Sequence, residues 1–326
     1  MKLRLTIIAI LGLALGLYLI TDVGLGAVLA AAVAVGWGGF AILLLYALGL
    51  FMVLGFAWYV LLPDATRATP WIFIRARMVR DAAADVLPFS QLGGLVLGAR
   101  AAILDAVPPP LAFASLVVDV TTEMLAQIAY VALGLIILIT HAPKSPAVVS
   151  FTHMASIGLA LGVLAGAVFL ALQRYGHRMT GKLITRLLRG SGAATEAVTS
   201  LLDAIYLRRG RVALSVAVHF FGWIVSAIGA WIAFRLIGTR LDLASVIAIE
   251  ALVCAARSAG SLVPNALGVQ EAAYAVLAPL FGVGAEFGLA VSLLKRARDI
   301  ALGVPILLLW QAAEGRRALA GKPSGI

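Results

Sequence analysis

The segment AILLLYALGLFMVLGFAWYVLL, Ala41–Leu62, carries no charged residue from its first position to its last. A helix needs about 20 apolar residues to cross the hydrocarbon core of a bilayer, and this run has that length. Leu125–Ile139 is a second run without a charge. A strand of a membrane barrel would instead alternate apolar and polar residues, and neither run does so. These two segments predict an all-α integral membrane protein.

The composition of the chain supports the same fold class. Of its 326 residues, 63% are hydrophobic and only 12% are charged, and the mean hydropathy is +1.06. Soluble domains carry about 25% charged residues. A water-soluble fold could not cover this much apolar surface, so lipid must surround much of the protein.

The formal net charge of +10 does not indicate a nucleic-acid partner. The basic residues are divided among short segments between apolar runs, where they determine topology and contact anionic lipids. The single cysteine, Cys254, excludes an intrachain disulfide. The four histidines (His141, His153, His177 and His219) are scattered, which favours solvated or interfacial positions over metal ligation. We expect no cofactor, no metal and no nucleic acid.

Six apolar runs are expected to span the membrane. Their approximate ranges are Leu5–Ile20, Gly39–Leu62, Leu111–Thr140, Phe151–Gln173, Val212–Leu236 and Glu286–Ala313. Lys2 and Arg4 before the first run would also suit a signal peptide, but we expect a retained first helix. Most basic residues follow the second, fourth and sixth runs. The positive-inside rule therefore predicts that both termini are cytoplasmic, and six crossings give the same result.

Two further apolar segments are interrupted. Asp81–Val107 is broken by Pro88, and Ala244–Phe281 is broken by Pro264 and Gly268. Such interruptions are tolerated at membrane depth where the segment is buried in protein or lines a cavity. Each segment must return to the side from which it entered. We interpret both as re-entrant helical hairpins, the first entering from the cytoplasm and the second from outside.

With these hairpins the order becomes span, span, hairpin, span, and then the same again in the opposite orientation. The whole chain would be one membrane domain with half-repeats of about 1–145 and 146–326. Pro88-Phe-Ser-Gln-Leu-Gly in the first hairpin corresponds to Pro264-Asn-Ala-Leu-Gly in the second. Inverted repeats with broken helices are the plan of many transporters. The alternative is a chance match, because Pro, Gly and Leu are common in membrane helices.

Polar residues form one stripe on the third expected span, because Ser115, Asp119, Thr122, Glu123 and Gln127 recur at steps of three or four. A carboxylate at the bilayer centre is costly unless it is paired, protonated or hydrated. Two interpretations remain open. The carboxylates pair with the basic cluster Lys295, Arg296 and Arg298 of the last span, or the same groups hold a charged headgroup.

The second hairpin offers further polar groups. Glu250 and Arg257 lie two helical turns apart on one face, and the helix that starts near Gly268 would present free backbone groups. We expect Arg257 and Glu271 of this hairpin to form one contiguous polar site with Asp119 and Glu123.

The segment Ser261-Leu-Val-Pro-Asn-Ala-Leu-Gly-Val-Gln-Glu271 resembles the S-x-x-P-x-x-L-G-x-x-E signature of a flippase-like family named after the transmembrane region of lysylphosphatidylglycerol synthases. The resemblance implies a bacterial inner-membrane lipid translocase whose motif residues are Ser261, Pro264, Leu267, Gly268 and Glu271. Only 16 residues follow Trp310, so we expect no soluble aminoacyl-transferase domain.

The first half is similar to the hopanoid-biosynthesis-associated HpnL subgroup of that family. The similarity lies in Phe73–Arg100, with Arg77-Met-Val-Arg80 and Leu87-Pro-Phe-Ser-Gln-Leu-Gly-Gly94, and in Val118-Asp119 with Glu123 and Gln127. It implies hopanoid metabolism as the context.

We therefore expect an alternating-access translocase, not an enzyme, that moves a hopanoid-related lipid or a phospholipid between leaflets. Its partners would be membrane lipids and other lipid-biosynthesis proteins. The alternatives are an intramembrane enzyme or an accessory protein of lipid biosynthesis; no nucleophile–base pair is visible. No catalytic residue is assigned. The candidate substrate-binding residues are Arg80, Ser90, Gln91, Arg100, Asp119, Glu123, Gln127, Glu250, Arg257, Ser261, Pro264, Asn265, Gly268, Glu271, Arg296, Arg298 and Asp299.

Overall fold

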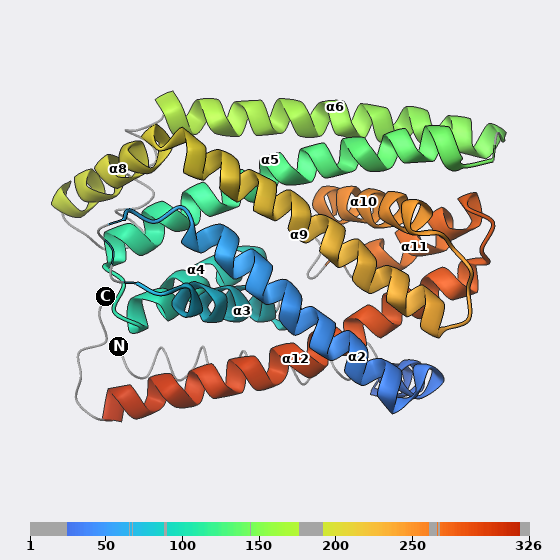
Figure 1. Cartoon of the computed structure of the whole chain (residues 1–326), viewed down its shortest axis with the longest axis horizontal. Helices are drawn as coiled ribbons and strands as arrows, with labels where there is room; N and C mark the ends of the chain where they lie inside the picture. Colours follow the sequence, from blue (N-terminus) through green and yellow to red (C-terminus); the bar gives the residue numbers. More distant parts are fainter. Residues whose placement is uncertain are drawn as a thin grey trace.

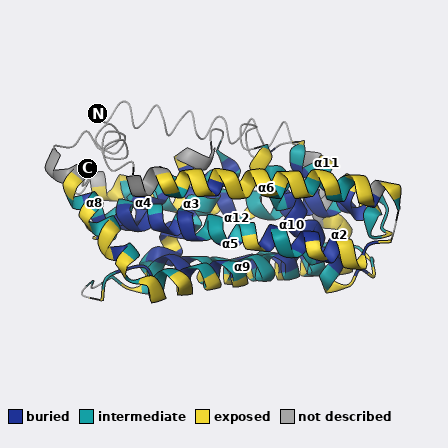
Figure 2. Ribbon diagram, turned by 90° about the horizontal axis from the view of Figure 1, so that it is seen from above, coloured by how far each residue is buried: buried dark blue, intermediate teal, exposed yellow. Residues whose placement is uncertain are grey.

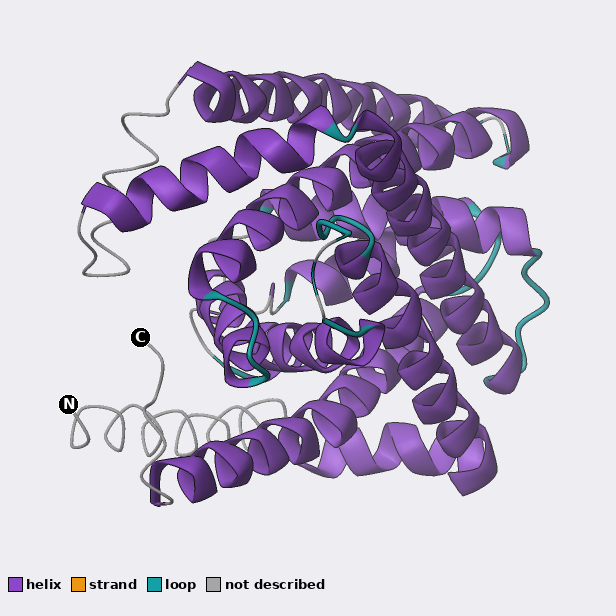
Figure 3. Ribbon diagram, turned by 60° about the vertical axis from the view of Figure 1, so that its left-hand side comes forward, coloured by secondary structure: helices purple, strands orange, loops and turns teal. Residues whose placement is uncertain are grey.

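The computed structural model describes residues 25–64, 66, 68–87, 90–143, 145–175, 192–260, 266 and 268–319, and these residues form ten α-helices and no strand (Figure 1, Figure 3). In chain order the helices are α2 (Leu25–Tyr59), α3 (Pro70–Val86), α4 (Ser90–Leu104), α5 (Pro109–His141), α6 (Pro146–Tyr175), α8 (Gly192–Leu207), α9 (Arg209–Leu236), α10 (Leu243–Ala259), α11 (Val269–Leu280) and α12 (Ala285–Leu319). The all-α fold class is confirmed.

Four of these helices are long and apolar enough to cross a membrane, and they correspond to the second to fifth expected spans. They are Val33–Tyr59, Pro109–His141, Val148–Ala171 and Arg209–Leu236. The sixth expected span lies within α12, which has 35 residues but is interrupted by the charges between Lys295 and Asp299. The first expected span, Leu5–Ile20, lies outside the described residues.

The first interrupted segment folds as two antiparallel helices, α3 and α4. Their backbones approach closely, because a Cβ atom on Gly94 would lie 2.6 Å from the carbonyl oxygen of Arg80. The sequence places the start of this hairpin at Asp81, and the structure corrects it to Pro70. Pro70 suits the first turn of a helix, where its missing N–H is not needed. Arg77 and Arg80, which precede Asp81, therefore lie on α3.

The second interrupted segment forms the antiparallel pair α10 and α11. The Asp242 carboxylate caps α10 by accepting a hydrogen bond of 2.7 Å from the backbone N–H of Ser245. Gly268, with a φ of 77°, occupies the left-handed region just before α11. The expected range, Ala244–Phe281, agrees closely with the two helices. Pro88 and Pro264, the expected breaks, lie outside the described residues.

The two helix pairs lie toward opposite ends of the long helices (Figure 1). Helix α3 packs against α12, and α10 packs against α5. Likewise α2 packs against α12, α9 packs against α5, and α2 and α9 pack against each other. These contacts stay the same when α2 is exchanged with α9, α3 with α10, and α5 with α12. Such reciprocity is what an internal repeat would produce.

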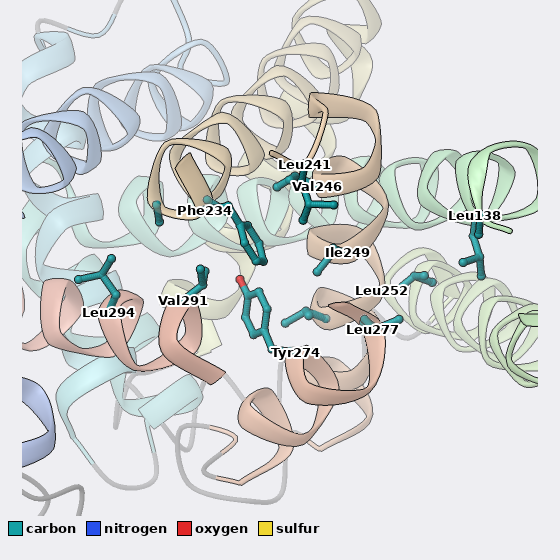
Figure 4. Packing of buried hydrophobic residues seen from close by; sticks show 14 of the residues in the cluster. Leu138, Phe234, Leu241, Val246, Ile249, Leu252, Tyr274, Leu277, Val291 and Leu294 are labelled. Carbon is teal, nitrogen blue, oxygen red and sulfur yellow. The ribbon is translucent and has the colours of Figure 1, made fainter. Parts of the chain in front are cut away.

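Each hairpin is held by its own apolar core. One core contains residues of α9, α10, α11 and α12, among them Phe234, Ile249 and Tyr274 (Figure 4). The other surrounds Trp58 and Phe73 between α2, α3 and α5. By contrast, α6 presents an exposed apolar surface (Figure 2). Exposed apolar side chains suit contact with lipid tails, which are as apolar as leucine.

The close approach of α3 and α4 makes Gly94 more sensitive to substitution than its neighbour Gly93. A Cβ atom at Gly94 meets the Arg80 carbonyl, whereas a Cβ atom at Gly93 meets nothing within 4 Å. Gly94→Ala should separate the helices, cost about 1–3 kcal/mol and lower the melting temperature in detergent. Gly93→Ala is the matched control and should melt like the parent protein. Equal melting temperatures for the two variants would contradict this packing.

Candidate functional site

Six helices enclose a cavity of about 490 Å³. Helices α2 and α9 contribute apolar side chains, among them Leu50, Phe51, Leu54 and Trp223. Helices α3, α5, α10 and α12 contribute ionisable ones. Ligand pockets commonly have volumes of about 300–1,000 Å³. The cavity is therefore large enough for a lipid headgroup and the first part of its tails.

Acidic and basic side chains line this cavity in equal number. The basic ones are Arg77, Arg80, Arg257, Lys295 and Arg298, and the acidic ones are Asp81, Asp85, Glu123, Glu250 and Asp299. The cavity wall thus has no net charge when all ten groups are ionised.

The first group of charges joins α3 to α5. Arg77 donates to Asp81 at 2.7 Å and to Glu123 at 2.6 Å, and Arg80 donates to Asp119 at 2.7 Å and to Glu123 at 2.6 Å. Arg77 and Arg80 are separated by about one turn of α3, and Asp119 and Glu123 are separated by about one turn of α5. Two cations therefore face two anions. Bidentate guanidinium–carboxylate pairs are among the stronger hydrogen bonds in proteins.

This arrangement corrects one of the two interpretations drawn from the sequence. Asp119 and Glu123 pair with arginines of α3, not with the basic cluster of the last span. The polar stripe on α5 does point at charged partners. The sequence did not identify these partners because Arg77 and Arg80 precede Asp81, the expected start of the hairpin, whereas α3 begins at Pro70.

His219 also differs from the expectation of a solvated or interfacial histidine. It is fully buried on α9, and its Nε2 lies 3.0 Å from Oδ1 of Asp119. One turn earlier, Ser215 lies within hydrogen-bonding distance of Thr122, at 2.9 Å. The sequence contained a signal for this contact, because Ser215, His219 and Ser226 recur on one face of α9.

A second group of charges joins α10, α11 and α12. The Lys295 ammonium donates to Glu250 at 2.5 Å and to the Tyr274 hydroxyl at 2.8 Å. The Tyr274 hydroxyl donates to Glu250 as well. Sequence reasoning identified Glu250 and placed Lys295 in the basic cluster of the last span, but it did not pair the two residues and it missed Tyr274. A lone tyrosine in an apolar helix gives no periodic signal.

A third group lies between the two hairpins. Arg257, near the end of α10, is 3.8 Å from Asp85, near the end of α3. Arg298 donates to the adjacent Asp299 at 2.7 Å. The structure thus brings Arg257, Arg298 and Asp299 to the same cavity as Glu123.

Other expected residues lie behind the wall. Asp119 is fully buried behind Arg80. Arg296 pairs with Glu271 and donates to the carbonyl oxygen of Ala266, a cavity residue, at 3.3 Å. Glu271 also accepts a hydrogen bond of 2.8 Å from the backbone N–H of Gly268. These contacts fix the start of α11 and support the wall.

The remaining candidates divide into three sets. Gln127 lines the cavity and donates to Ser258 at 2.6 Å. Arg100 does not line it and pairs with Glu314. The side chains of Ser90 and Gln91, and the residues Ser261, Pro264 and Asn265, lie outside the described residues.

Comparison with known proteins adds one finding. A family model described as the lysylphosphatidylglycerol synthase TM region matches residues 3–306. The match does not distinguish the hopanoid-associated subgroup. No curated protein and no solved structure matches the chain.

The buried pair of Lys295 and Glu250 makes a prediction about stability. Lys295→Met should leave the Glu250 carboxylate without its cation and cost about 3–5 kcal/mol. Adding Glu250→Leu should recover most of that loss, because a well-packed apolar pair can replace a buried ion pair. Melting temperatures of the parent, both single variants and the double variant measure the coupling. A double variant no more stable than Lys295→Met would show that the pair is not coupled.

Proposed function

The chain belongs to the family of lysylphosphatidylglycerol synthase transmembrane regions, and we propose that it moves a polar-headed lipid between the two leaflets of a membrane. The lipid would be hopanoid-related or a phospholipid. The observation that carries the proposal is the cavity of about 490 Å³, which is lined by five acidic and five basic side chains within a helical membrane protein.

The free-energy cost of placing these charges within the membrane supports a transport role. An ionised group within a bilayer costs several kcal/mol, and such groups are usually functional. Apolar contacts could hold the helices together as well as buried ion pairs do. A path for a polar headgroup gives the charges a purpose that helix packing alone does not. The apolar side chains of α2 and α9 would meanwhile contact the tails of the lipid.

The arrangement of helices supports an alternating-access mechanism. In the proposed topology α3–α4 and α10–α11 are re-entrant hairpins that enter from opposite faces of the membrane. The reciprocal packing of α3 on α12 and α10 on α5 agrees with an inverted repeat. The two hairpins approach each other at Asp85 and Arg257. Movement of one hairpin at a time would open the cavity to one side.

The proposed location is the inner membrane of a bacterium, with both termini in the cytoplasm. Arg208, Arg209 and Arg211 mark the start of α9, whereas Arg235 and Arg240 mark its other end. More basic residues therefore lie where α9 begins, which agrees with a cytoplasmic position for that end.

The topology can be tested by labelling single cysteines in intact cells, with Cys254→Ser as the background. Ser200→Cys, on α8, should react with an impermeant thiol reagent only after permeabilisation, because α8 is proposed to be cytoplasmic. Arg240→Cys, beyond the other end of α9, should react in intact cells. Labelling of both positions from the same side would refute the proposed topology.

Transport can be tested with purified protein in liposomes that contain a trace lipid labelled on its tail. The protein should accelerate exchange between leaflets, and the recovered lipid should be chemically unchanged. Arg257→Gln should slow exchange at least about tenfold, a loss of about 1.4 kcal/mol, because it removes a cavity cation. Arg235→Gln, outside the cavity, is the control and should exchange lipid normally.

Chemical modification of the lipid without exchange would favour the alternative, an intramembrane enzyme. Normal exchange by Arg257→Gln would show that the cavity is not the path.

A further inference from the structure

We propose that the cavity selects a zwitterionic phospholipid headgroup, with its phosphate on Arg257 and its ammonium between Asp85 and Asp299. This inference rests on the proposed function and specifies the chemistry of the lipid that is moved. The probes that define this class are phosphatidylethanolamine, which has no net charge, and phosphatidylglycerol, which has a net negative charge.

The pair of Arg257 and Asp85 is the loosest ion pair of the cavity wall. Their closest atoms are 3.8 Å apart, beyond hydrogen-bonding distance. The other pairs on the wall, such as Arg77 with Glu123 and Lys295 with Glu250, lie at 2.5–2.7 Å. The Arg257 guanidinium makes no hydrogen bond to any described residue, although it carries several donors.

The same pair is also the most accessible one on the wall. The side chains of Arg257 and Asp85 are 33% and 28% exposed, whereas that of Arg77 is 4% exposed and that of Lys295 is 10% exposed. A headgroup that enters the cavity can therefore reach the Arg257 guanidinium without first breaking a short buried ion pair.

The local charges match a phosphate next to an ammonium. Guanidinium groups bind phosphate through two parallel hydrogen bonds. Asp299 lines the same cavity as Asp85 and Arg257. Arg298 also donates to Asp299 at 2.7 Å, so two cations and two carboxylates lie together here, and Arg257 is the more loosely held cation. A zwitterion can extend the alternation of charges by placing its phosphate against the cation and its ammonium against the carboxylates.

Charge balance disfavours an anionic headgroup. The cavity wall carries five basic and five acidic groups. Asp119 adds one carboxylate behind the wall, next to His219. A headgroup with a net negative charge would add to this set without a compensating cation, and an uncompensated buried charge is costly. A zwitterion leaves the total unchanged.

The position of the pair suggests how binding could affect transport. Asp85 lies in the last turn of α3, and Arg257 lies in the last turn of α10. The headgroup would therefore bridge the two hairpins at the point where they approach each other. Binding at such a point can stabilise one arrangement of the hairpins relative to another, as differential affinity requires.

The test uses liposomes made from equal parts of phosphatidylethanolamine and phosphatidylglycerol, with a tail-labelled trace of one or the other. The parent protein should exchange phosphatidylethanolamine about ten times faster than phosphatidylglycerol, a difference of about 1.4 kcal/mol. Asp85→Asn keeps the shape of the side chain and removes one negative charge. It should raise the rate for phosphatidylglycerol relative to phosphatidylethanolamine by a similar factor.

Asp105→Asn is the matched control. Asp105 pairs with Arg75 and Arg317 and does not line the cavity, so its substitution should leave the ratio of rates unchanged. Asp299→Asn makes the same charge change as Asp85→Asn and replaces it if that variant does not fold.

Exchange of phosphatidylglycerol as fast as phosphatidylethanolamine by the parent protein would overturn the inference and leave lipid translocation intact. An unchanged ratio in folded Asp85→Asn would also overturn it. Exchange of neither lipid would refute translocation of phospholipids itself.

Discussion

Charges next to hydrocarbon must be paired, and this requirement determines how the helices of this protein pack. Arg77 and Arg80 on α3 meet Asp119 and Glu123 on α5 at 2.6–2.7 Å. Because each set spans only one helical turn, shifting α3 by a turn relative to α5 would break most of these contacts. The ion pairs therefore fix the register of these helices. Since α3 also packs on α12, the same contacts position one hairpin relative to the second half of the chain.

The helical membrane fold could be predicted because Ala41–Leu62 needs only its length and lack of charge to be recognised. Helical periodicity likewise placed Asp119 and Glu123 on one face of α5. Periodicity identifies a face but not the neighbouring helix, so it did not identify Arg77 and Arg80 as the partners of Asp119 and Glu123. The number of crossings and the re-entrant nature of the hairpins stay predictions.

Residues that act singly were harder to recognise. His219 shares one face of α9 with Ser215 and Ser226, but its contact with Asp119 depends on how α9 packs against α5. Tyr274 likewise joins Glu250 and Lys295 only once α10, α11 and α12 are assembled. The cavity has no signature in any one segment because six helices contribute to it.

The pairing of the cavity charges also bears on how the protein responds to membrane voltage. A unit charge that crosses a potential of 100 mV exchanges about 2.3 kcal/mol with the electric field. The charged atoms of Lys295 and Glu250 lie 2.5 Å apart, and those of Arg77 on α3 and Glu123 on α5 lie 2.6 Å apart. When such pairs move together, they carry almost no net charge through the field. A rearrangement that moves these pairs intact would therefore transfer little net charge across the membrane.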